Sequence, residues 1–340
     1  MRGNGNSILA GGFALALAAG PTAAQTAGDF FRGRTVDFVI GYPPGGGYDI
    51  FGRALAQHMG RHIPGQPNIV VRNMPGAASL KAVQYLVTGA PRDGTAFGIF
   101  NSNLITTGMT DPQAIGVDMG ALTWLGNMVS DTKTCFSWRA SGIASVDQLR
   151  ARTFVIGGTS RGSAYVYGSL LRHAYGESRV KIVLGYPSNV DAYLAMERGE
   201  VMGICTGYDI VRQLRPEWFR NDSIAFLVQY GEVSEPGLEQ VPTVYDLPLG
   251  EEMKQAARFY IGADRIARPV AAPPGVPADR VAALREAFDR TLADPEFQAA
   301  SRRAHMEVQP MNAAELTRIV NAIRATPSAI VDIARGLAEQ

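Results

Sequence analysis

The chain has 340 residues, of which 46% are hydrophobic and 19% charged, so its composition is that of an ordinary globular protein and excludes a largely disordered one. Its 32 basic and 31 acidic residues leave a formal net charge of +1, which gives no support for a nucleic-acid-binding surface. The length is sufficient for two domains.

The N-terminus is typical of an export signal. Arg2 supplies a small positive region, residues 8–19 form an apolar stretch of 12, and Thr22-Ala23-Ala24 offers small residues for cleavage before Gln25. The apolar stretch is too short to span a bilayer, which needs about 20 residues. A buried N-terminal helix is the alternative. We expect residues 1–24 to be a signal peptide and the mature protein to be exported.

A glycine loop follows the first predicted strand. Residues 36–40 form an apolar, β-branched run typical of a buried strand, and Pro43 and Pro44 end it because proline cannot donate to a sheet. Apolar residues at helical spacing predict a helix over 48–61. Between them, Gly45-Gly46-Gly47 leaves backbone N–H groups uncovered at the positive end of the helix dipole. The loop is therefore either an anion site or a tight turn that binds nothing.

Strands and helices then alternate. We expect strands over 68–73 and 95–100, with a helix over 79–87 between them. This alternation predicts right-handed βαβ units and a parallel sheet, on which ligands bind at the carboxyl ends of strands. The segments at these ends should therefore converge in space. They are residues 42–49, 75–78 and Asn101-Ser102.

The second half repeats this design. Residues 153–175 indicate an apolar strand, a glycine-rich polar loop and a helix, so we expect two βα domains that each open with a glycine loop. A return strand is predicted over 259–272. Amphipathic spacing then predicts three helices over 278–294, 313–324 and 327–338, which should pack on the first domain.

The two cysteines, Cys135 and Cys205, each lie in an apolar, strand-like segment. In an exported protein an even count favours a disulfide, and two buried free thiols are the alternative. No third cysteine or nearby histidine completes a metal site, so we expect no bound metal.

The sequence does not match the nucleotide-binding or zinc-protease motifs. Neither glycine loop has the lysine of a phosphate-binding P-loop, and the spacing after Gly47 does not fit the dinucleotide fingerprint. His58 and His62 stand four apart on a helix, but Met59 occupies the place of the glutamate that a zinc protease requires. These histidines therefore indicate a solvated helix face.

One catalytic pattern does match. Residues 158–162 fit Gly-x-Ser-x-Gly between a strand and a helix, the context of a nucleophile elbow. A secreted serine esterase that uses Ser160 is therefore an alternative function. It would need His173 or His305 as its base. His173 should point away from the loop. No His-Gly-Gly-Gly oxyanion segment precedes the Gly-x-Ser-x-Gly pattern.

The second glycine loop is better explained as a binding site for a carboxylate than as a catalytic site. Thr159, Ser160 and Ser163 can offer hydroxyls to a carboxylate, and Arg161 can offer a bidentate fork, although a solvent-facing arginine is an equal alternative. Several tyrosines could wall an organic ligand, and Asp49 either matches the helix dipole or accepts from a ligand or water. These tyrosines are Tyr42, Tyr48, Tyr165 and Tyr208.

The motif Val-Ile-Gly-Tyr-Pro-Pro-Gly-Gly-Gly-Tyr-Asp at 39–49 resembles the signature loop of the receptors of tripartite tricarboxylate transporters, the Bug family. Further segments are similar to that family in the expected order. They are residues 73–77, 91–95, 101–103, 158–163, 195–201 and 271–277.

The resemblance implies an α/β, type II periplasmic-binding fold, with two Rossmann-like domains joined by two crossing strands and a ligand cleft between them. Domain 1 would comprise residues 29–130 plus 258–340, and domain 2 residues 131–257. The family captures small carboxylates and delivers them to a membrane permease. We therefore expect a monomeric receptor without catalysis, cofactor or nucleic-acid partner.

By the same resemblance, the two glycine loops hold the carboxylate, partly through water, and Asn101 and Ser102 line the wall of the first domain. Met202 stands where the family commonly has aspartate, and Arg161 replaces a small residue, so we expect a substrate other than citrate. The predicted ligand site is Tyr42, Pro44, Gly45, Gly46, Gly47, Tyr48, Asp49, Asn101, Ser102, Thr159, Ser160, Arg161, Gly162, Ser163 and Tyr208.

Overall fold

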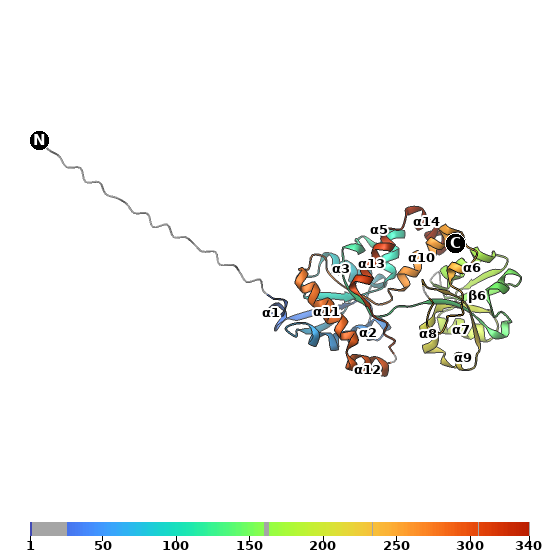
Figure 1. Ribbon diagram of the computed structural model, residues 1–340, viewed down its shortest axis with the longest axis horizontal. Coiled ribbons are helices and arrows are strands. Elements are labelled where there is room, and N and C mark those ends of the chain that lie inside the picture. The colour runs from blue at the N-terminus through green and yellow to red at the C-terminus, as the bar shows by residue number, and fades with distance from the viewer. Residues whose placement is uncertain (2–25, 160–162, 233, 305, 340) are drawn as a thin grey trace.

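Two sheets form the frame of the protein (Figure 1). The computed structural model describes residue 1 and residues 26–159, 163–232, 234–304 and 306–339, so the predicted signal peptide lies outside the described residues. The larger sheet contains β1 (Thr35–Ile40), β2 (Asn68–Asn73), β3 (Ala96–Ile99), β4 (Thr123–Asn127), β10 (Pro269–Ala272) and β11 (Met311–Asn312). The smaller sheet contains β5 (Lys133–Trp138), β6 (Phe154–Gly158), β7 (Val180–Leu184), β8 (Gly203–Gly207) and β9 (Ile224–Tyr230).

Helices surround both sheets. In chain order they are α1 (Ala27–Phe31), α2 (Gly47–Met59), α3 (Leu80–Thr88), α4 (Asn103–Thr110), α5 (Pro112–Ile115), α6 (Ser163–Tyr175), α7 (Asn189–Glu197), α8 (Tyr208–Leu214), α9 (Pro216–Arg220), α10 (Glu251–Asp264), α11 (Ala278–Ala293), α12 (Pro295–Arg303), α13 (Ala313–Arg324) and α14 (Ser328–Glu339). No helix of the described ranges is both long and apolar enough to cross a membrane.

Each sheet combines parallel and antiparallel strands. The larger has the order β11-β4-β10-β3-β1-β2, in which β1 is parallel to β2 and β3 while β10 is antiparallel to β3 and β4. The smaller has the order β7-β6-β8-β5-β9, in which β6 is parallel to β7 and β8. The parallel βα units predicted around each glycine loop are therefore present, and each sheet is completed by antiparallel strands.

The first strand forms because its side chains are buried on both faces of the sheet. Val36, Phe38, Val39 and Ile40 are fully buried. Burial of each such side chain stabilises the fold by about 1.5–3 kcal/mol. Parallel strands covered on both faces have this near-continuous apolar pattern, which is why the sequence pattern predicted the strand.

Two antiparallel segments connect the halves. The chain leaves the larger sheet after β4 and re-enters it at β10, and these crossings are hydrogen-bonded to each other. The N–H of Ala267 donates to the carbonyl of Val129 at 3.0 Å, and the N–H of Asp131 donates to the carbonyl of Asp264 at 3.3 Å. Figure 1 shows this narrow connection between the two halves.

The predicted return strand over 259–272 is wrong in its first part. Residues up to Asp264 belong to α10, and only Pro269–Ala272 form a strand. The helix is rich in strong helix formers such as alanine, glutamate and lysine, and it buries Ala256, Phe259 and Ile261. Its apolar residues therefore follow a helical face and not a continuous strand.

The final helices differ partly from expectation. α11 and α13 pack against β4 in the larger sheet, as predicted for the first domain. The last helix, α14, packs against α10 and α4 but also against α6, which follows the second glycine loop (Figure 1). The C-terminal helix therefore contacts both halves.

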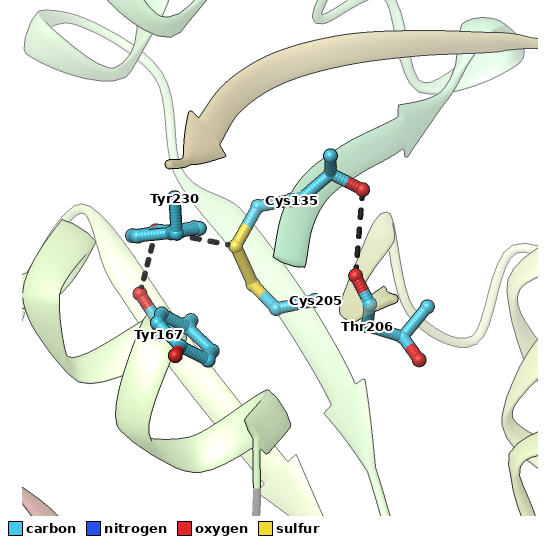
Figure 2. The surroundings of a disulfide bond; sticks show 6 residues. Cys135, Tyr167, Cys205, Thr206 and Tyr230 are labelled. Atoms are coloured by element: carbon cyan, nitrogen blue, oxygen red, sulfur yellow. Dashed lines mark hydrogen bonds between the residues drawn. A yellow bond between two sulfur atoms is a disulfide. The ribbon is translucent and has the colours of Figure 1, made fainter. Parts of the chain in front are cut away.

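The structure contains the disulfide that the even cysteine count favoured. Cys135 and Cys205 are directly opposite each other in the antiparallel pair of β5 and β8, with their Cα atoms 4.0 Å apart. Figure 2 shows the bond beside Tyr230, whose hydroxyl lies 3.4 Å from Cys135 Sγ and donates to the carbonyl of Tyr167 at 2.8 Å. The bridge is buried in the core of the smaller sheet.

Candidate functional site

A cleft of about 360 Å³ lies between the two halves, beside the crossing segments. α2 borders it on the side of the larger sheet and α8 on the side of the smaller sheet. Figure 1 shows these two helices facing each other from the two halves. The described residues that line it are Gly47, Tyr48, Ile50, Phe51, Asn101, Ser102, Asn103, Val129, Asp131, Lys133, Asp209, Ile210, Gln213, Asp264, Ala267, Arg268, Ala304, Met306 and Glu307.

The first glycine loop reaches the cleft through Gly47 and Tyr48. The Tyr48 ring stacks on Tyr42, with centroids 4.4 Å apart and planes 12° from parallel. Its hydroxyl donates to the carbonyl of Ala267 at 3.2 Å, which connects α2 to a crossing segment. Burial raises the pKa of Tyr48 to about 12, although the charge of Arg268 opposes this shift. The Tyr48 side chain is therefore a neutral wall of the site.

Asp49 is engaged within the loop. It is 4% exposed, and its carboxylate accepts hydrogen bonds from the N–H of Gly45 at 2.9 Å, from Asn73 Nδ2 at 2.8 Å and from Arg53 Nε at 2.9 Å. Burial alone would raise the pKa of Asp49, but these hydrogen bonds hold it below its usual value. Because Asn73 also donates to the carbonyl of Tyr42 at 2.9 Å, this network ties the loop to the end of β2.

Asn101 and Ser102 follow β3 and line the same cleft, as expected for residues after a parallel strand, whereas residues 75–78, which were expected there too, do not line it. Asn101 Nδ2 donates to the Tyr42 hydroxyl at 3.1 Å, and its Oδ1 accepts from the N–H of Asn103 at 3.0 Å. Ser102 is 5% exposed, and within the described residues its hydroxyl has no hydrogen-bond partner. It is therefore a polar group that a ligand can use.

Other residues of the predicted ligand site lie elsewhere. Among the described residues, Tyr42, Pro44 to Gly46, Asp49, Thr159 and Tyr208 do not line the cleft. Tyr208 begins α8 but packs in an aromatic cluster, with Phe219 and Phe226 at centroid distances of 5.9 and 5.4 Å. Ser160, Arg161 and Gly162 lie outside the described residues, as does the side chain of Ser163.

A buried charge cluster at the crossing segments was missed by the sequence analysis. The ammonium group of Lys133 pairs with Asp131 and lies 3.8 Å from Asp264, to which the Tyr167 hydroxyl also donates. Burial would lower the pKa of Lys133, but the carboxylates of Asp264 and Asp131 raise it above its usual value. The sequence did offer a signal for this cluster, because Asp131 and Lys133 are charged residues that lie between apolar strands at the predicted domain boundary.

Arg268 was also missed. Its guanidinium carbon lies 4.2 Å from the centroid of the Tyr48 ring, so Tyr42, Tyr48 and Arg268 form one stack at the edge of the cleft. The backbone N–H of Arg268 donates to Asn127 Oδ1 at 2.9 Å, which fixes the crossing segment to the end of β4.

Two acidic side chains, one from each half, meet at the cleft. Asp209 on α8 and Glu307, which follows α12, both line the cleft. Burial, together with the nearby Glu307, raises the pKa of Asp209 to about 7. Arg212 lies 3.9 Å from Asp209 and so gives it a distant counter-charge. In the described part of the chain, no group of three or more His, Cys, Asp or Glu residues is arranged to hold a metal ion.

The serine-esterase pattern gains no support at the cleft. Ser160 and His305 lie outside the described residues. His173 lies on α6, where its Nδ1 is 2.8 Å from the carbonyl of Ser169, and it borders a separate hollow with Met253 and α14.

Known proteins resemble this chain in sequence and in structure. No family model matches the chain. A UPF0065 protein in the gbd 5′ region of Cupriavidus necator is 25% identical over 337 residues, covering 96% of this chain and 94% of that protein. A TctC solute-binding protein from Polaromonas has a TM-score of 0.69 at 19% identity, covering 89% of this chain and 97% of that one. R. palustris Rpa4515, solved with adipate, has a TM-score of 0.59 at 18% identity, covering 88% and 97%. These likenesses confirm the two-domain type II periplasmic-binding fold and the predicted resemblance.

Proposed function

We propose that this chain, which resembles the TctC and Bug receptors of tripartite tricarboxylate transporters, is a periplasmic receptor for a small organic carboxylate. It would capture the acid in the cleft between its two halves and deliver it to a transporter of that type. The similar structures support the receptor fold, and the one solved with adipate supports a carboxylate as the class of ligand.

The observation that carries this proposal is the convergence at the cleft. Gly47 and Tyr48 follow β1, and Asn101 and Ser102 follow β3, and these segments, far apart in sequence, line one cavity. This is the edge at which open α/β sheets bind ligands. The volume of about 360 Å³ lies within the range of small-molecule sites.

We assign the predicted residues two roles. Gly47, Tyr48, Asn101 and Ser102 contact the ligand, whereas Asp49, together with Tyr42, holds the glycine loop in place. The second loop, residues 159–163, would approach the ligand when the halves close, because receptors of this architecture close by hinge motion around their ligand. Tyr208 would not contact the ligand. It would instead position α8, the helix that also carries Asp209.

Export and delivery complete the proposal. Residues 1–24 would direct the chain across the membrane and be removed near Ala24. The mature receptor would act as a monomer and dock on permease subunits in its closed, loaded form.

The test is to identify what the protein binds. Native mass spectrometry of protein purified without denaturation should reveal a co-purified acid, and a thermal-shift screen with mono-, di- and tricarboxylates should raise the melting temperature for at least one. A ligand at 100-fold over its Kd adds about 2.7 kcal/mol to the free energy of unfolding. If no carboxylate binds, the proposal fails. A fluorophosphonate probe should leave Ser160 unlabelled, and labelling there would favour the esterase.

A further inference from the structure

Within the described residues, not every N–H donor of Arg268 has an acceptor. Its Nη1 donates to the carbonyl of Ala267 at 2.8 Å, while its buried Nε has no hydrogen-bond partner in the described part of the chain. Within the described residues Arg268 forms no ion pair. A guanidinium group has five N–H donors in a fixed plane, and a buried donor left unpaired is costly. The side chain is therefore incomplete without a further acceptor.

Aromatic rings pack against this guanidinium. Its carbon lies 4.2 Å from the centroid of Tyr48 and 5.4 Å from that of Phe51, and the Tyr48 ring is itself stacked on Tyr42. Stacking of this kind restrains the plane of an arginine while its N–H groups remain at the edge. The group is thus oriented before any ligand arrives.

The neighbouring cation is already neutralised. Lys133 lines the same cleft but is paired with Asp131 and close to Asp264. It also lies in the buried cluster, where its side chain is only 12% exposed. Of these two cations, Arg268 is therefore the one with charge available to an anionic ligand.

The residues around Arg268 leave room for such a ligand. A Cβ atom at Gly47 would lie 3.2 Å from Arg268 Nη2, so the absence of a side chain there keeps the guanidinium uncrowded. Ser102, whose hydroxyl has no hydrogen-bond partner among the described residues, lines the same cavity.

We propose that Arg268 binds a carboxylate of the ligand through its unused N–H groups and gives the cleft its preference for acids over the corresponding amides. This inference rests on the proposed function and names the residue that recognises the ligand. The fork of a guanidinium matches the two oxygens of a carboxylate, and a stacked, partly buried fork does so with little loss of freedom.

The test compares Arg268 with a matched arginine elsewhere. Arg280 also stacks on an aromatic ring, with its Cζ 3.6 Å from the centroid of Phe30, donates to a backbone carbonyl (Asp93, 2.9 Å) and has an unpartnered Nε. It does not line the cleft. Arg280→Gln should therefore have a similar structural cost without touching the ligand.

Calorimetric titration would use adipate, malate and benzoate, each with its amide, on the wild type, Arg268→Gln, Arg268→Lys and Arg280→Gln. For an acid that binds the wild type, Arg268→Gln should raise Kd about 30-fold or more, which corresponds to loss of one partner of a buried charged pair. Arg268→Lys should lose less. The ratio between acid and amide should collapse in Arg268→Gln and stay unchanged in Arg280→Gln.

The outcomes separate the two claims. If the wild type binds none of these acids, the proposed function and this inference fail together. If an acid binds the wild type and Arg268→Gln equally well, or if the acid-to-amide ratio survives the substitution, only the role of Arg268 is overturned. A loss of affinity that Arg280→Gln reproduces would mean that the effect is structural, and it would also overturn the assignment.

Discussion

The carboxylate of Asp49 accepts a hydrogen bond from the N–H of Gly45, four residues earlier in the chain, at 2.9 Å. This contact closes the glycine loop on itself at the N-terminus of α2. The N–H of Gly45 is therefore used within the protein, and the part of the loop that reaches the cleft is Gly47 and Tyr48. Asp49 therefore holds Gly47 and Tyr48 in position at the cleft.

Asp49→Ala should weaken ligand binding while the protein still folds. The change removes the charged acceptor of the Gly45 N–H, of Asn73 and of Arg53, and because a hydrogen bond to a charged group contributes about 1.5–3 kcal/mol, the free energy of unfolding should fall by about that amount. Urea denaturation and calorimetric titration with adipate measure the two effects. The control is Asp37→Ala, whose ion pair with the exposed Arg72 is worth about 0–1 kcal/mol. Unchanged affinity in Asp49→Ala would remove Asp49 from the site.

Asp209 should make stability depend on pH. Its pKa is raised from the usual 3.8 to about 7 by burial and by Glu307, with smaller contributions from Glu235 and Asp131, while Arg212 is the cation beside it. Between these two pH values the folded state holds a proton that the unfolded state has lost. This contribution therefore stabilises the fold most at low pH and is lost as the pH rises through 7.

Asp209→Asn should remove that dependence. At pH 8 the variant should melt at a higher temperature than the wild type, because it no longer carries a buried charge opposite Glu307, and at pH 5 the difference should shrink or reverse. Thermal melts at the two pH values give the result, and Glu307→Gln should act in the same direction. Identical pH profiles for wild type and variant would contradict the assignment of this titration to Asp209.

Lys133→Met should be strongly destabilising. Asp131 and Asp264 would then lie together in the buried cluster without their cation, and removal of one partner of a buried pair costs about 3–5 kcal/mol. Urea denaturation measures the loss, and Lys181→Met, at an exposed position of β7, is the control. Adding Asp264→Asn should restore part of the stability, since it removes one uncompensated charge. A fully stable Lys133→Met protein would show that water compensates these carboxylates.

The disulfide should be detectable by a free-thiol assay and by its effect on the free energy of unfolding. Unfolded, unreduced protein should show no free thiol. The bond closes a loop between residues 70 apart, and the chain-entropy model gives it about 4 kcal/mol. Reductant should therefore lower the urea midpoint of the wild type but not that of a Cys135→Ala/Cys205→Ala variant. Two free thiols in the unreduced protein would end this assignment.

The local features of the fold could be predicted, because they depend on residues close in sequence. The apolar run of β1 and the prolines after it predicted a strand, and the position of Asn101-Ser102 after a parallel strand predicted their place in the cleft. By contrast, Asp209, Arg268 and Glu307 come from three distant segments that meet only when both halves are in place. No pattern within any one segment marks them as neighbours.

The error over 259–272 has a similar origin. Its apolar residues were assigned to one strand, whereas Phe259 and Ile261 face the helices that pack on α10 and only Pro269–Ala272 join the sheet. A run of apolar residues does not distinguish a buried helix from a strand, and the neighbours that decide between them, α13 and α14, come later in the chain.

The bond between Cys135 and Cys205 has a mechanical consequence for the cleft. Cys135 lies two residues after Lys133, at the end of a crossing segment, and Cys205 lies on the strand that leads directly into α8. The covalent bridge therefore joins the strand that follows the crossing segment to the strand that leads into the helix of Asp209, so that these two strands would move together in the proposed closure. Reduction would remove this covalent link without changing any residue that lines the cleft. We therefore expect ligand binding to be weaker under reducing conditions.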